Sequence, residues 1–191
     1  KIQLSQWRYL QVMHESQRYA AIIIDKILGG TNLDIAFKNV FENVKGLEHK
    51  SQTKAITYGA LRYMGQSKYL IKSLVRKKIE NRLVESLIHV ALFQLSHEPH
   101  NDFTIVDQAV KATKKIDLRK SNFVNAVLRN FLRNKDVLTK RFLEQEEGQF
   151  NYPIWWIQKV KKQYKSDWED ILNIGNDHPP MTIRVNKRKI E

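Results

Sequence analysis

Cysteine is absent from the 191 residues, and glycine and proline are scarce, with seven and four copies. Without cysteine the chain has no disulfide framework, no cysteine-ligated zinc site and no thiolate nucleophile, which is compatible with a cytoplasmic setting. None of the glycines stands in a G-x-G spacing, which excludes the usual glycine-rich loop for a dinucleotide or nucleoside. The longest wholly apolar run near the start covers residues 20–24, too short for a signal-peptide core or a membrane span.

Negative charge is also in short supply. Lysine and arginine number 33 against 20 aspartates and glutamates, a net charge of +13. Residues 49–79 hold eight lysines and arginines and no acid, and residues 111–135 hold eight with one acid, Asp117. Such an excess attracts polyanions, so we predict a nucleic acid partner and no membrane. The alternative is a helical protein-interaction domain whose basic faces only keep it in solution.

Apolar residues recur at helical spacing along most of the chain. The pattern predicts an all-α bundle, with a short first helix over 1–15 and a second that Ser16 caps. The broadest apolar pattern, over 81–96 after a capping Asn81, predicts a central buried helix with His89 on its polar side. His97 and His100 flank Pro99 in a loop, but no acid or thiol completes a metal shell there, and we predict no metal site. Further helices are expected at 31–46, 48–64, 67–75, 105–116 and 121–133.

The composition changes after Arg133, and a linker is expected over 148–153. We predict two helices after it and a short strand over 181–185, where apolar and polar residues alternate. A lone strand is not stable by itself, so this end has the pattern of the first elements of a second domain. The expected domains are therefore 1–147 and 148–191.

The helix predicted over 121–133 has two unlike halves. On a helical wheel its large apolar residues cover one half, while Asn122, Arg129 and Arg133 share one narrow arc of the other and Asn125 lies at the border. Burying six large side chains is worth on the order of 10 kcal/mol, so other helices must pack around this one. A face of amides and guanidinium groups suits phosphates and base edges. An ordinary core helix with a solvated back is the alternative interpretation.

Five segments of the chain carry motifs that together resemble one family. The segments are Phe-Val-Asn-Ala-Val-Leu-Arg at 123–129, Arg-Tyr-Ala-Ala at 18–21, Tyr-Gly-Ala-Leu-Arg at 58–62, Ala-Leu-Phe-Gln-Leu at 91–95 and Val-Asp-Gln-Ala-Val at 106–110. They are similar to motifs of the NusB-like family. This family contains transcription antitermination factors and the N-terminal RNA-binding domain of RsmB (Sun) type ribosomal RNA cytosine-C5 methyltransferases. The resemblance implies a NusB-like helical bundle that binds RNA.

The last forty residues resemble only the methyltransferase branch. Tyr-Pro-Ile-Trp-Trp at 152–156 is similar to its Tyr/His-Pro-x-Trp-Leu motif, and residues 176–186 are similar to its Asn-x-x-Pro-Pro-x-x-Leu-Arg-Val-Asn motif. In that branch the second motif begins a linker domain that leads into the methyl-transfer domain. The resemblance implies ribosomal RNA as partner and S-adenosylmethionine as cofactor of the full-length enzyme. The alternative is a free-standing antitermination factor that binds RNA and a protein partner.

The 191 residues contain neither the thiolate that attacks the pyrimidine ring nor a loop for the cofactor, so we expect the catalytic part beyond Glu191 and no catalytic residue here. The resemblance also allows self-association or a protein partner through the bundle. We expect RNA to contact the 121–133 helix, the first-turn Arg18 of the second helix, and part of the basic zone. The candidate RNA-binding residues are Arg18, Lys54, Arg62, Arg76, Lys77, Lys78, Lys120, Asn122, Asn125, Arg129 and Arg133.

Overall fold

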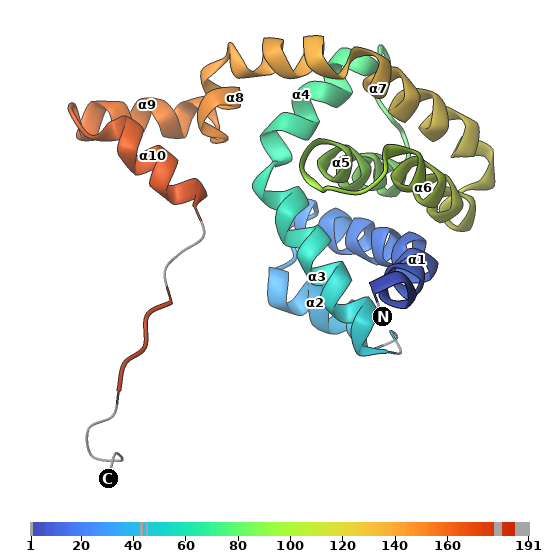
Figure 1. The fold of residues 1–191 in the computed structure, drawn as a ribbon. Helices are drawn as coiled ribbons and strands as arrows, with labels where there is room; N and C mark the ends of the chain where they lie inside the picture. The colour runs from blue at the N-terminus through green and yellow to red at the C-terminus, as the bar shows by residue number, and fades with distance from the viewer. Residues whose placement is uncertain (1, 43, 45, 178–180, 186–191) are drawn as a thin grey trace.

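The computed structural model describes residues 2–42, 44, 46–177 and 181–185, with side chains described from Met13 on except at residues 47 and 48. Ten α-helices and one short 3-10 helix make up this part of the chain, which contains no strand (Figure 1). The all-α prediction is therefore confirmed. The helices are α1 (Ile2–Leu28), α2 (Leu33–Phe41), α3 (Leu47–Arg62), α4 (Met64–Leu74), α5 (Arg82–His97), α6 (Asp102–Ile116), η1 (Leu118–Lys120), α7 (Ser121–Leu143), α8 (Glu146–Phe150), α9 (Ile154–Gln163) and α10 (Trp168–Asn176).

Helix α5 is the centre of the bundle, as its broad apolar pattern predicts. Asn81 caps it, and the Asn81 side chain accepts hydrogen bonds from the backbone N–H groups of Leu83 and Val84. Helices α1, α3, α4, α6 and α7 all pack against it (Figure 1). His89 differs from the prediction because it is buried, with its Nδ1 2.7 Å from the hydroxyl of Ser67 on α4. That hydroxyl lies 22 residues away in the chain and satisfies the imidazole inside the core.

The first helix is continuous, so the prediction of a break at Ser16 is wrong. Ser16 is fully buried in the middle of α1, and no glycine or proline stands before the turn at Gly29. Polar Gln17 is tolerated in the core because its side-chain amide donates to Gln94 of α5 at 2.7 Å. Arg18 therefore lies in mid-helix and not in a first turn.

Two further boundaries differ from the sequence-based expectation. Helices α3 and α4 meet at Tyr63, so the gap expected between the helices at 48–64 and 67–75 is absent and Gly65 lies inside α4. Helix α7 continues ten residues past Arg133, because Leu138 and Phe142 extend its buried face. Gly59 lies in the middle of α3 against the ring of Phe93, where the missing side chain lets α3 approach α5 closely.

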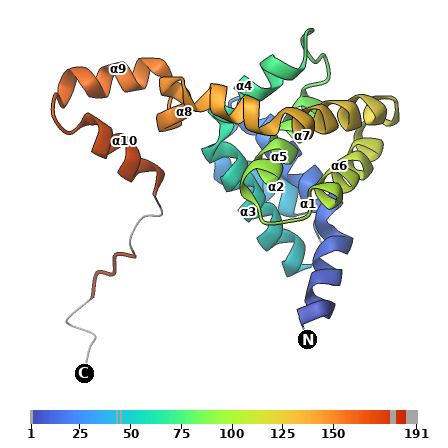
Figure 2. The ribbon, with the colours of Figure 1, turned by 45° about the horizontal axis from the view of Figure 1, so that its top comes forward.

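The last three helices form a small unit beside the bundle (Figures 1 and 2). Phe150, Ile157, Val160 and Leu172 make its core. The expected linker at 148–153 is helical as far as Phe150, because Gly148 and Phe150 are buried in α8. The predicted strand at 181–185 is wrong: these residues are exposed and unpaired, since an isolated strand has no ladder partner. No helix in the described ranges has the length and apolarity that a bilayer crossing requires.

Candidate nucleic-acid interface

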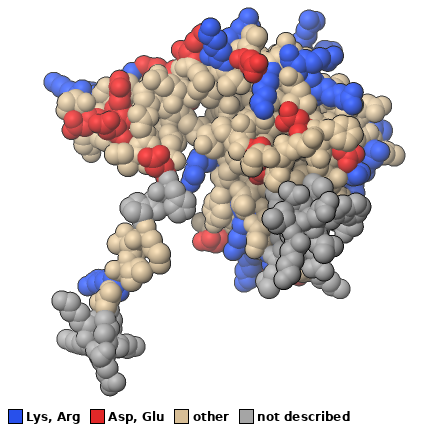
Figure 3. Space-filling view, viewed as in Figure 1, with Lys and Arg blue, Asp and Glu red and all other residues tan. Residues whose placement is uncertain are grey.

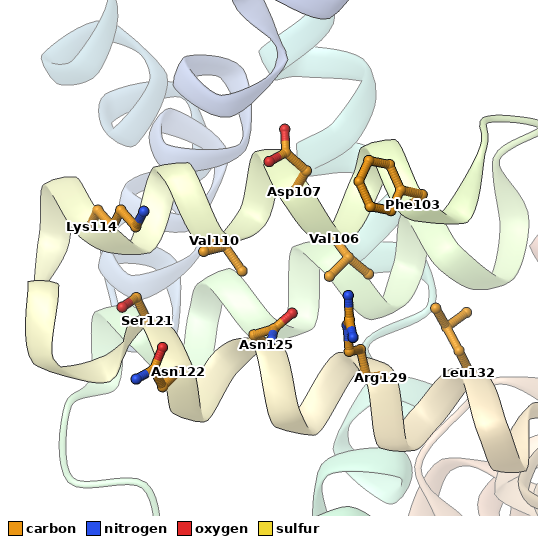
Figure 4. Close-up of a pocket in the computed structure, with 10 residues that line it drawn as sticks. All are labelled: Phe103, Val106, Asp107, Val110, Lys114, Ser121, Asn122, Asn125, Arg129 and Leu132. Atoms are coloured by element: carbon orange, nitrogen blue, oxygen red, sulfur yellow. The ribbon is translucent and has the colours of Figure 1, made fainter.

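Helices α6 and α7 lie side by side and leave a groove of about 520 Å³ between them (Figure 4). The tight turn through η1 brings the chain back, so the C-terminal end of α6 faces the start of α7. Both helices contribute side chains to the groove. Its lining residues are Phe103, Val106, Asp107, Val110 and Lys114 from α6, and Ser121, Asn122, Asn125, Arg129 and Leu132 from α7.

The groove has an apolar side on α6 and a polar side on α7. Val106 and Val110 form an apolar wall on α6, and the side chains of Asn125 and Arg129 point toward that wall from α7 (Figure 4). Phe103 stands at one end of the groove with 71% of its surface exposed. Aromatic and apolar surfaces stack against unpaired bases, amides bind base edges, and guanidinium groups bind phosphates.

The groove carries net positive charge. Its one acid, Asp107, is paired with Lys111 one turn later, with 2.7 Å between carboxylate and ammonium. Lys114 and Arg129 make no ion pair with any residue that the structure describes. Both remain available to an anionic ligand, and the predicted residues Asn122, Asn125 and Arg129 are thereby brought together at one site.

Arg18 is held by the bundle. Its guanidinium donates two hydrogen bonds to Glu15, at 2.8 and 3.0 Å, and lies over the ring of Tyr19. Glu15 also pairs with Lys115 of α6. Burial raises the pKa of Glu15, but the hydrogen bonds from Lys115 and Arg18 outweigh burial and leave that pKa below its ordinary value. This cluster therefore links α1 to α6, and the Glu15 carboxylate partly neutralises the charge of Arg18.

The remaining predicted residues lie on other parts of the bundle. Lys54 and Arg62 are exposed on α3, and neither lines the α6–α7 groove. The backbone carbonyl of Arg62 accepts a hydrogen bond from Asn151, directly after α8. Lys54 lies 5.9 Å from the ring centres of Phe37 and Phe41. Arg133 is exposed on α7 outside the groove, and Lys120 is half-buried at the start of α7. Arg76, Lys77 and Lys78 line a separate hollow between α4 and α5.

Sequence reasoning missed the α6 side of the groove. Phe103, Asp107, Val110 and Lys114 are spaced at i, i+4, i+7 and i+11, which places them on one stripe of a helix. That spacing was the available signal. The stripe combines aromatic, acidic, apolar and basic residues, unlike a helix face that is wholly buried or wholly solvated.

Two family matches cover most of the chain. Residues 14–133 match the NusB family, and residues 152–191 match the family described as Methyltr_RsmF/B-like, ferredoxin-like domain. The domain division predicted at residues 147 and 148 stays a prediction.

Three curated relatives illustrate what the chain is similar to. A Coxiella burnetii protein named "Probable ribosomal RNA small subunit methyltransferase B" is 33% identical over 148 residues, 75% of this chain. Proteins named ribosomal RNA small subunit methyltransferase B are 32% identical over 72% of this chain in Citrobacter koseri and 28% identical over 93% of it in Proteus mirabilis. The alignments cover 34%, 33% and 43% of these three relatives, so the chain spans less than half their length.

Proposed function

Since the chain belongs to the NusB family, we propose that it is the RNA-binding N-terminal region of a ribosomal RNA cytosine-C5 methyltransferase that uses S-adenosylmethionine. The observation that carries the proposal is the presence in one chain of a NusB match over residues 14–133 and, from residue 152, a match to the RsmF/B-like ferredoxin-like family. The names of the relatives support the same activity. This combination favours the methyltransferase over a free-standing antitermination factor.

The role of this chain in the proposed enzyme is to bind ribosomal RNA. The sequence contains neither a glycine-rich loop in G-x-G spacing for the cofactor nor a cysteine that could serve as the nucleophile. Methyl transfer is therefore assigned to another part of the protein. A cytoplasmic location follows from the proposed substrate, and self-association or a protein partner stays a prediction.

Within this proposal, the α6–α7 groove and the adjoining Arg133 form the RNA surface. An unpaired base fits between the apolar wall of α6 and the amide of Asn125, while Arg129 and Lys114 bind the phosphates on either side. Arg18, Lys54 and Arg62 lie outside the groove. Their contribution to RNA binding is proposed as secondary, through general attraction of the polyanion.

A charge reversal on α7 tests the proposal. The double variant Arg129→Glu/Arg133→Glu changes two exposed side chains without an ion pair among the described residues, so helicity and melting are expected to stay unchanged. Affinity for a ribosomal RNA fragment should fall, and the slope of log affinity against log salt should decrease by about one unit for each phosphate that the variant no longer binds. The matched control is Lys159→Glu/Lys162→Glu, the same charge change on exposed positions of α9.

The comparison of the two variants decides the outcome. A clear loss of affinity in the α7 variant and a small one in the control support binding at the groove. Equal losses in both would mean that net charge alone attracts the RNA. An unchanged affinity and salt slope in a folded α7 variant would refute the groove as the RNA site.

A further inference from the structure

A second hollow, of about 300 Å³, lies where α4 ends and α5 begins, and it shares no lining residue with the α6–α7 groove. Five cations line it: Lys68, Lys72, Arg76, Lys77 and Lys78. Lys68 and Lys72 are one helical turn apart on α4, so they share a face. Figure 3 shows lysine and arginine side chains gathered over the upper part of the bundle, where Figure 1 places α7 and the α4–α5 connection.

The charge of this hollow is not balanced by the protein. None of the five cations forms an ion pair with a residue in the described part of the chain, and Glu85 is the one carboxylate in the lining. The C-terminal end of α4 supplies roughly half a negative charge through its dipole. Most of the positive charge therefore remains, and an anion entering the hollow lowers the repulsion among the five cations.

The buried histidine of α5 forms part of the same lining. His89 is 3% exposed, and its Nδ1 lies 2.7 Å from the hydroxyl of Ser67. Burial, with the nearby charge of Lys68, lowers the pKa of His89 to about 4. At neutral pH the imidazole is therefore uncharged, and its place in the lining makes it a local reporter for a test of binding.

We propose that this hollow binds a phosphate group of the RNA backbone, with Lys68 and Lys72 as its principal ligands. The inference rests on the proposed RNA-binding function and adds a second anchoring point to the α6–α7 groove. A volume of about 300 Å³ equals that of roughly ten water molecules in the liquid, enough for a phosphodiester and part of its ribose. Two anchoring points would define the path of the RNA strand across the bundle.

The first test measures RNA binding by the 191-residue chain. The variant Lys68→Gln/Lys72→Gln removes two charges at exposed positions, and Lys159→Gln/Lys162→Gln on α9 is the matched control. For a single-stranded ribosomal RNA fragment, each phosphate that the variant no longer binds should reduce the salt slope by about 0.7 and weaken binding roughly fourfold at about 0.15 M salt. The control should bind like the unchanged chain.

The second test uses His89 as a local reporter. Imidazole NMR signals of His89, assigned with a His89→Gln variant, should shift when the RNA fragment is added to the unchanged chain and should stay in place in the Lys68→Gln/Lys72→Gln variant. Inorganic phosphate at the same phosphate concentration serves as the small-anion probe. It should cause a much smaller shift, because it lacks the contacts that the neighbouring nucleotides make elsewhere on the bundle.

Each further outcome has a definite meaning. If the Lys68→Gln/Lys72→Gln variant binds RNA like the control, or if RNA leaves the His89 signals in place, the hollow is not an RNA contact. An equal shift with inorganic phosphate overturns the assignment to an RNA backbone. If these failures occur while Arg129→Glu/Arg133→Glu still weakens RNA binding, only this inference falls. A chain that binds no ribosomal RNA overturns the proposed function together with it.

Discussion

Replacing Gly59 by alanine should destabilise the bundle, although alanine is the better helix former. Gly59 lies in the middle of α3, where this helix packs against α5. A Cβ atom at this position would stand 2.0 Å from Cζ of Phe93, and 2.5 and 2.7 Å from its two Cε atoms. Carbon atoms in contact are ordinarily about 3.5–4.0 Å apart. The Phe93 ring would have to move, but it is buried and stacked on Tyr63 with 5.9 Å between the ring centres.

The size of the effect follows from two opposing terms. Alanine gains about 1 kcal/mol over glycine inside a helix. Inserting a methyl group into a filled core costs about 1–3 kcal/mol, and the 2.0 Å approach puts Gly59→Ala at the upper end. The free energy of unfolding should therefore fall by about 1–2 kcal/mol, and Tm by roughly 2–8 °C for a chain of this size.

Chemical denaturation of four proteins provides the assay: the unchanged chain, Gly59→Ala, Phe93→Leu and the double variant. The smaller leucine makes room for the methyl group, so the double variant should be more stable than the sum of the single changes predicts, by about 0.5–3 kcal/mol. Gly65→Ala in α4 is the control, because its Cβ would be 3.8 Å from the nearest atom, Oδ1 of Asn151. This variant should be neutral or stabilising by up to about 1 kcal/mol. A Gly59→Ala protein as stable as the unchanged chain, with additive effects in the double variant, would refute the proposed clash.

Two other predictions concern the end of the bundle and its buried histidine. A Cβ on Gly148 would lie 1.8 Å from the carbonyl oxygen of Phe142, a backbone atom that cannot rotate away. Gly148→Ala should therefore lower the local stability of α8 by on the order of 3 kcal/mol. Hydrogen exchange should become faster in α8 and stay unchanged in α5. His89 has a pKa of about 4 in the folded chain and 6.5 in the unfolded chain, so between these pH values the unfolded chain binds more protons. The free energy of unfolding should therefore fall as the pH drops from about 6.5 toward 4, by up to about 3 kcal/mol. Unfolding curves between about pH 7 and 4.5 should show this loss, and His89→Gln should reduce it; a variant that keeps the full pH dependence would assign it to other groups.

Most of the bundle could be predicted from the sequence because its strongest signals are local. The apolar surface of α5 covers almost its whole circumference, and Asn32 and Asn81 cap their helices with side-chain oxygens, as such residues commonly do. The continuity of α1 could not be predicted in the same way. Ser16 is a residue type typical of a helix start, and the distant partners of Gln17, Gln94 and the carbonyl of Ile105, are not visible in the local sequence.

The candidate site, too, could be predicted only where its signal lies within one helix. The α7 face of Asn122, Asn125 and Arg129 is visible in one helical repeat, and the structure places all three in the groove. Only part of the lining of the hollow beside α4 could be predicted from the sequence. The run at 76–78 is plainly basic in sequence, but the contributions of Lys68, Lys72 and His89 depend on how α4 meets α5.

The groove itself depends on the turn that joins its two helices. Asp117 accepts a hydrogen bond from the backbone N–H of Arg119, and the hydroxyl of Ser121 donates to the carbonyl of Leu118, so α7 begins directly after η1. This short return sets the register of two stripes, one at 103, 107, 110 and 114 on α6 and one at 122, 125, 129 and 132 on α7. Each stripe alone is compatible with a solvated helix face. Because the turn makes them face each other, the apolar wall of α6 meets the amide and guanidinium groups of α7, and this pairing is what the proposed binding of a base together with its phosphate requires.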